Sequence, residues 1–165
     1  MDGLPMKIAL LLLALLPVYS EDRSDESIAE HRAAVAAAVW ENSQGKPLPP
    51  RDWTRLMLTV GFHESGFSKR IIAGKCKKHE CDRGRAKGAW QIHANTLNRD
   101  KWRDQDGDLP LQAKLASEML VRAYWTCARS GVEPVRGALN AFAGKRCGSD
   151  WPGLKARLAT YGRLR

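Results

Sequence analysis

Residues 53–67 read WTRLMLTVGFHESGF, and their apolar side chains recur at the spacing of a helix. Trp53, Leu56 and Val60 lie three and four positions apart, which places them on one helical face. Gly66 follows this run, and a glycine commonly ends a helix because it accepts the left-handed backbone conformation. We therefore expect a helix that buries this face and ends at about Gly66.

The spacing of apolar residues predicts further helices on both sides of this stretch. Ser27 and Glu30 form a capping-box pattern, so we expect a first helix from about Ser27 to Asn42. Residues 66–93 lose the helical spacing, which is typical of a long loop or a small hairpin that carries a site. More helices are expected at Ala94–Arg103, Leu111–Arg129, Pro134–Ala143 and Gly153–Tyr161.

Glu64 is the candidate catalytic residue. It continues the apolar stripe four positions beyond Val60, so we expect its carboxyl group to face the protein interior. The helix dipole disfavours negative charge near a helix C-terminus, and Phe62, Phe67 and Trp90 are candidate apolar neighbours. These effects favour a protonated acid, which could donate a proton to the leaving oxygen of a glycoside. The alternative is a last-turn glutamate that points into solvent.

Three blocks of the sequence resemble soluble lytic transglycosylases and goose-type lysozymes, which belong to the lysozyme-like superfamily. The block HESGF at 63–67 matches the Glu-Ser pair that ends a helix in these families. The block GRAKGAWQIH at 84–93 matches their Gly-x-x-Gln segment, and ALNAFAG at 138–144 is similar to their Ala-Leu-x-Ala-Tyr-Asn run. The resemblance covers about residues 50–160.

The resemblance implies a mainly α-helical, α+β lysozyme-like fold, in which a helical part and a small hairpin or loop lobe form a cleft. It also implies an enzyme that cleaves peptidoglycan glycan strands between N-acetylmuramic acid and N-acetylglucosamine. Glu64 is then the general acid, and the expected substrate-binding residues are Ser65, Gln91, Asn140 and Phe142. Neither a cofactor nor a metal is implied.

The third block departs from the family pattern at the Tyr-Asn pair, where this chain has Phe142 and Ala143. The aromatic ring is kept, whereas the hydroxyl and the amide are lost. Asn140 lies three residues before Ala143, about one helical turn away, and is the candidate to replace the lost amide.

Trp90 and Gln91 are adjacent, so in an extended segment their side chains point to opposite sides. Core packing is the commoner fate of a tryptophan. Gln91 carries both a donor and an acceptor, which suits sugar hydroxyls or an N-acetyl group. The resemblance favours Gln91 as the residue that contacts the ligand.

A second carboxylate would separate two mechanisms. Glu80 and Asp82 are the candidates, because either could reach across the cleft as a base or as an electrostatic stabiliser. The alternative for both is pairing with the many neighbouring lysines and arginines. Without a second carboxylate, Glu64 would act first as acid and then as base, and would release a 1,6-anhydro product. With one, a water molecule would be activated and the reaction would be hydrolysis.

Residues 1–20 are typical of an export signal. Lys7 precedes an unbroken apolar run at 8–16, and cleavage is expected before Glu21. The run is shorter than the ~20 residues that a membrane span needs. The alternatives are a buried N-terminal helix and a signal-anchor that stays in the membrane. We expect one domain over 21–165, located in the periplasm or outside the cell.

The chain has four cysteines, and an even number behind an export signal predicts disulfides. We expect the two local pairs, Cys76–Cys81 and Cys127–Cys147, because each closes a loop within one predicted unit. The competing interpretation is a zinc site at Cys76, His79 and Cys81. That set lacks the usual paired Cys-x-x-Cys spacing and an obvious fourth ligand.

The formal net charge of +9 predicts attraction to polyanions, which include nucleic acid, anionic lipid and acidic wall polymers. The lysines and arginines are spread along loops and helices, whereas a nucleic-acid-binding helix concentrates them on one face. This spread disfavours nucleic acid as the partner. The resemblance implies peptidoglycan as the substrate, and we expect a monomer. The alternatives are a non-catalytic wall-binding protein on the same fold and a basic nucleic-acid-binding helical domain.

Overall fold

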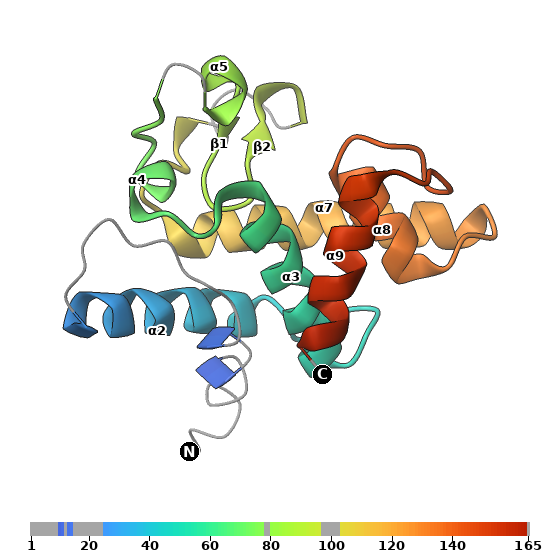
Figure 1. Ribbon diagram of the computed structural model, residues 1–165, viewed down its shortest axis with the longest axis horizontal. Coiled ribbons are helices and arrows are strands. Elements are labelled where there is room, and N and C mark those ends of the chain that lie inside the picture. Colours follow the sequence, from blue (N-terminus) through green and yellow to red (C-terminus); the bar gives the residue numbers. More distant parts are fainter. Residues whose placement is uncertain (1–9, 12, 15–24, 78–79, 97–102, 165) are drawn as a thin grey trace.

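The computed structural model describes residues 10–11, 13–14, 25–77, 80–96 and 103–164, and within these ranges the protein is mainly α-helical. The longer helices form a body: α2 (Asp25–Glu41), α3 (Pro50–Ser65), α7 (Leu109–Arg129), α8 (Pro134–Phe142) and α9 (Pro152–Arg163). A smaller lobe on one side of this body contains short elements: α4 (Lys69–Ile72), α5 (Cys81–Gly84), β1 (Ala86–Lys87), β2 (Ile92–His93) and the 3₁₀ turn η1 (Ala94–Thr96) (Figure 1). The predicted fold class, a helical domain with a small hairpin lobe, is confirmed.

Helix α3 lies at the centre of the body and contacts α2, α7, α8 and α9 (Figure 1). It ends where the sequence predicts, with Gly66 in the left-handed conformation and its N–H bonded to the Phe62 carbonyl. Every residue from Trp53 to Gly61 is buried, which is more than the single apolar face expected. The Trp53 indole donates to Ser117 Oγ on α7 at 3.0 Å, so even the polar atom of this large side chain is satisfied.

The remaining helices follow the predictions with shifted ends. Helices α7, α8 and α9 begin or end within two residues of the expected bounds, as is usual for helix termini. Helix α2 begins at Asp25, so Ser27 lies inside the helix and the predicted capping box is wrong. The helix expected at Ala94–Arg103 starts as the 3₁₀ turn η1, and residues 97–102 lie outside the described ranges.

A tight hairpin organises the lobe. Strands β1 and β2 pair antiparallel, with Ala86 opposite His93, and residues 88–91 form the turn between them. Gly88 has a φ of +73°, and a Cβ at this position would lie 2.6 Å from Gln112 Cδ. Only glycine fits here, because both the backbone conformation and the close approach of Gln112 exclude a side chain.

Gln112 is a fully buried residue of α7 that connects the lobe to the body. Its Oε1 accepts a hydrogen bond from the Ala89 N–H at 2.8 Å. Its Nε2 donates to the carbonyls of Ile72 at 2.9 Å and Gln105 at 2.6 Å. One side chain therefore satisfies three backbone groups from three segments, and the hairpin turn is held at a defined position on α7.

Both predicted disulfides are present, and no free cysteine remains. Cys76–Cys81 closes a loop within the lobe, and Cys127–Cys147 connects the end of α7 to the segment after α8. The zinc interpretation is therefore wrong, because its thiol ligands are oxidised. In the lobe, the disulfide leads into a left-handed turn, with φ values of +52° at Cys81, +46° at Asp82 and +56° at Arg83.

The N-terminal predictions fall mostly outside the described ranges. Most of residues 1–20, and the expected cleavage point before Glu21, are not described, so the export signal stays a prediction. Leu13, from the apolar run, is fully buried in the core. None of the helices in the described ranges is long and apolar enough to cross a membrane.

Two histidines lie at contacts between segments that are distant in sequence. His31 on α2 donates from Nε2 to the Phe67 carbonyl at 2.6 Å. His63 on α3 lies with its Nε2 at 2.9 Å from Thr160 Oγ1 on α9. Burial lowers the pKa of both imidazoles below the ordinary value of 6.5, because it penalises the charged form.

We predict that Gln112→Met lowers the free energy of unfolding by about 3 kcal/mol, because three buried backbone groups lose their hydrogen-bond partner while side-chain volume is retained. Urea unfolding measures this change. Gln44→Met is the matched control, since the exposed Gln44 makes only local hydrogen bonds and its loss should change stability by less than about 0.5 kcal/mol. Equal stabilities of the two variants would show that Gln112 does not hold the lobe.

We predict that stability falls as the pH drops below about 6.5. With a folded pKa below the unfolded value, His31 and His63 bind fewer protons in the folded state than in the unfolded state. The loss should begin near the unfolded pKa and be complete below the lowered folded pKa. Urea midpoints at pH 7.5, 6.5 and 5.5 test this, and His31→Gln should reduce the slope. An unchanged slope in this variant would remove His31 from the explanation.

Candidate active site

A cleft of about 450 Å³ opens at the C-terminal end of α3, between the hairpin lobe and the helical body. Three of the five residues that the resemblance assigns to catalysis and substrate binding line it: Glu64, Gln91 and Phe142. The other lining residues come from several segments: His93 and Asn95 after the turn, Met119 on α7, Ala141, Ala143, Gly144 and Lys145 at the end of α8, and Trp151 and Arg157 at α9.

The Glu64 carboxyl group is one-fifth exposed and pairs with Arg157, whose Nη2 donates to Glu64 Oε1 at 2.7 Å. The carboxyl group thus faces the cleft and neither the apolar core nor open solvent. Of the apolar neighbours expected around it, Phe67 and Trp90 pack edge to face in the core with ring centroids 5.8 Å apart. The expectation of apolar neighbours did not include the guanidinium that α9 brings to Glu64.

Ser65 does not line the cleft. Its hydroxyl donates to the Ala89 carbonyl at 2.6 Å and accepts from the Phe67 N–H at 3.0 Å. The predicted contact with substrate is replaced by a structural one, since the hydroxyl joins the end of α3 to the hairpin turn. This bond places Glu64, one residue before Ser65, beside the turn that carries Gln91.

Trp90 lies in the core and Gln91 lies at the cleft, which is the placement that the resemblance favours. Trp90 is fully buried, and its indole donates to the Met57 carbonyl at 2.9 Å. Gln91 lines the cleft in a left-handed conformation with a φ of +49°, and its Nε2 donates to the Gly88 carbonyl at 2.9 Å. A non-glycine residue in this region costs energy and is often found at functional sites. The strained turn is what directs the Gln91 side chain towards the cleft.

Asn140 is fully buried and does not line the cleft. Its Nδ2 donates to the carbonyls of Cys147 at 2.7 Å and Ser149 at 2.9 Å, and its Oδ1 accepts from the Trp151 indole at 2.8 Å. The structure therefore does not bring Asn140 to the cleft with the other predicted substrate-binding residues, since both ends of its amide bind other groups of the protein. Instead, Asn140 holds the Trp151 ring in the wall of the cleft.

Trp151, Lys145 and Arg157 are site residues that the sequence analysis did not identify. Trp151 and Phe142 are half-buried rings in the cleft wall, and such rings offer apolar faces to a sugar. Trp151 lies directly before Pro152, which begins α9. This loop position was the feature of the sequence that could have marked Trp151 as a site residue. Nothing in the local sequence distinguishes Lys145 or Arg157 from the other cations.

Neither candidate for a second carboxylate lines the cleft. Asp82 is half-exposed, and its carboxylate lies 3.7 Å from His93 Nδ1. Glu80 accepts from Arg70, and this hydrogen bond lowers the pKa of Glu80 to about 2. The structure favours the pairing alternative for Glu80. Among the described residues that line the cleft, Glu64 is the one carboxylate.

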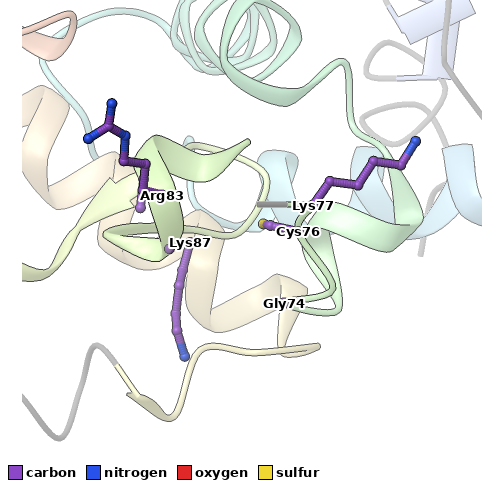
Figure 2. Close-up of a pocket in the computed structure, with 7 residues that line it drawn as sticks. Gly74, Cys76, Lys77, Arg83 and Lys87 are labelled. Carbon is purple, nitrogen blue, oxygen red and sulfur yellow. The ribbon is translucent and has the colours of Figure 1, made fainter. Parts of the chain in front are cut away.

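A larger hollow of about 800 Å³ lies within the lobe, next to the Cys76–Cys81 disulfide (Figure 2). Figure 2 shows the side chains of Lys77, Arg83 and Lys87 pointing in three different directions, and Lys87 forms an ion pair with Asp106. Its described lining contains neither a carboxylate nor an aromatic side chain. We therefore place the candidate active site in the smaller cleft, where the chemically capable groups converge.

No metal-binding group was found among the described residues, where no three His, Cys, Asp or Glu side chains come together as a site. No protein-family model, no curated protein and no solved structure matches the chain.

We predict that Asn140→Ala lowers the free energy of unfolding by about 2 kcal/mol, because the Trp151 indole and two carbonyls lose their partner. Chemical denaturation measures stability, and the indole N–H resonance of Trp151 reports its release. Asn95→Ala is the control, since Asn95 is exposed at the cleft. A residue that only bound substrate would leave stability and the Trp151 resonance unchanged.

Proposed function

We propose that this protein cleaves the glycan strands of peptidoglycan, between N-acetylmuramic acid and N-acetylglucosamine, with Glu64 as the general acid. The observation that carries the proposal is the position of Glu64. It is the one carboxylate among the described lining residues of a cleft that also presents Gln91 and the rings of Phe142 and Trp151. The resemblance to lytic transglycosylases and goose-type lysozymes supports the same assignment.

With one carboxylate in the described lining, the reaction that fits best is lytic transglycosylation. Glu64 donates its proton to the glycosidic oxygen as the bond from the muramoyl C1 to that oxygen breaks. The Glu64 carboxylate then takes the proton of the muramoyl 6-hydroxyl, whose oxygen bonds to C1 and forms the 1,6-anhydro ring. Glu64 ends the cycle protonated. The reaction therefore consumes no water molecule and needs no second carboxylate.

The ion pair with Arg157 sets a requirement on this cycle. The 2.7 Å contact holds the Glu64 carboxyl group against Arg157, whereas the first step needs this group at the glycosidic oxygen. For that step, the pair has to open as the substrate enters.

The same ion pair favours a second candidate, a non-catalytic peptidoglycan-binding protein on this fold. A glutamate that stays paired with Arg157 would hold the cleft in shape without transferring a proton. The loss of the Tyr-Asn pair at Phe142 and Ala143 points in the same direction. For either candidate we propose an exported protein, and the two disulfides support this location because such bonds persist in oxidising compartments.

We predict that Glu64→Gln folds like the parent and cleaves glycans at least about 100-fold more slowly, because a general acid contributes 10²–10⁴-fold to the rate. The amide keeps an acceptor for Arg157 but has no transferable proton. Mass spectrometry of digested peptidoglycan measures the rate and also identifies the product, which we expect to carry the 1,6-anhydro ring.

Asp82→Asn is the control on mechanism. Asp82 is half-exposed and outside the cleft, so we expect only a small change in rate. A collapse in rate would instead support hydrolysis with two carboxylates. Undiminished cleavage by Glu64→Gln would refute the assignment of Glu64. A parent protein that binds peptidoglycan but cleaves none of it would favour the non-catalytic candidate.

A further inference from the structure

We propose that the cleft contains a carboxylate-binding subsite, formed by Lys145 and Arg157 around Trp151, which selects glycans that bear a carboxylate group. The inference deepens the proposed function, on which it rests for the class of substrate. The ligand group is the carboxylate of N-acetylmuramic acid itself or of the peptide attached to it.

Both cations lie close to one aromatic ring. Lys145 Nζ lies 5.7 Å and Arg157 Cζ lies 5.8 Å from the centroid of the Trp151 ring, and all three residues line the cleft. The ring is itself held in place by the buried Asn140. The cations therefore lie at a defined wall of the cleft, and Arg157 is in contact with the Glu64 carboxyl group.

Both cations retain capacity for an anion. The Arg157 side chain is only 8% exposed, and its Nη2 donates to Glu64. Its Nη1 is buried and makes no hydrogen bond in the part of the chain that the structure describes. A buried donor without a partner costs free energy, which an incoming acceptor would recover.

Lys145 pairs with no carboxylate among the described residues, and in this it differs from other cations of the protein. Several of those form ion pairs at 2.6 Å or less: Arg55 with Asp52, Arg70 with Glu80, and Lys87 with Asp106. Lys145 is exposed, lies over the Trp151 ring and projects from the cleft rim after α8. It is available to a ligand without the loss of an existing ion pair.

The charge of the lining has a chemical consequence. Two cationic side chains and one carboxylate leave an excess of one positive charge in the cleft when histidine is neutral. A glycan of N-acetylglucosamine alone has no group to neutralise this charge. N-acetylmuramic acid differs from N-acetylglucosamine by a lactyl ether whose carboxylate is either free or bonded to a peptide with carboxylates of its own.

The test compares three probes that differ in their carboxylates: N-acetylglucosamine, N-acetylmuramic acid and muramyl dipeptide. The first is neutral, the second has a free lactyl carboxylate, and the third has a peptide carboxylate with the lactyl group amidated. NMR titration of the protein gives each affinity. We expect at least one carboxylated probe to bind more tightly than N-acetylglucosamine, and the difference to shrink in high salt.

Variants at one position assign the effect to Lys145. Lys145→Ala should weaken the preferred carboxylated probe by about threefold and leave N-acetylglucosamine unchanged. Lys145→Arg should restore the preference because it restores the charge. Lys155→Ala is the matched control, since it removes an exposed lysine of α9 that does not line the cleft.

Each outcome decides one question. Preference for N-acetylmuramic acid assigns the lactyl carboxylate, and preference for muramyl dipeptide alone assigns the peptide. Equal binding of all three probes, no binding of any, or an equal effect of Lys145→Ala on neutral and carboxylated probes overturns the inference. Glycan cleavage without such a preference would refute the subsite alone, whereas a preference without cleavage would refute only the proposed reaction.

Discussion

One hydrogen bond, from the Ser65 hydroxyl to the Ala89 carbonyl at 2.6 Å, connects the central helix to the hairpin turn. Glu64 stands one residue before the donor, and Gln91 stands two residues after the acceptor. The bond therefore determines that a carboxyl group from the body and an amide from the lobe face the same cleft. Gln112 holds the other side of the turn through the Ala89 N–H, so both polar groups of this one residue are used for positioning.

The opposite wall of the cleft is built by a second buried amide. Asn140 binds two carbonyls of the segment between α8 and α9 and the Trp151 indole, and Cys127–Cys147 ties that segment to α7. The same physical reason holds both walls in place. A buried polar side chain must find partners for its donors and acceptors, and this requirement leaves it one stable position. Residues that line the cleft are thus held in place by buried residues that do not line it.

Charge links the proposed reaction to the proposed subsite. Arg157 is the partner of Glu64, and it is also one of the two cations that could bind a ligand carboxylate. A ligand carboxylate that binds Arg157 would share this guanidinium with Glu64.

The sequence by itself determined the features that depend on spacing over a few residues. These include the buried stripe of α3, its end at Gly66, the two local disulfides, and the division of Trp90 and Gln91 between core and cleft. Glu64 was proposed from its place on the stripe together with the resemblance, and the structure places it at the cleft. Such features are predictable because helical period, turn conformation and short loop closure are local properties of the chain.

Only the tertiary structure decided which groups surround Glu64. Arg157 lies 93 residues from it, and no local pattern says that α9 packs beside the end of α3. Asn140 and Ser65 carry the polar groups expected of ligand contacts, yet the fold turns both towards backbone partners. The physical reason is that a polar side chain reaches a ligand or a neighbour according to what packs against its helix, which is fixed by contacts between segments distant in the chain.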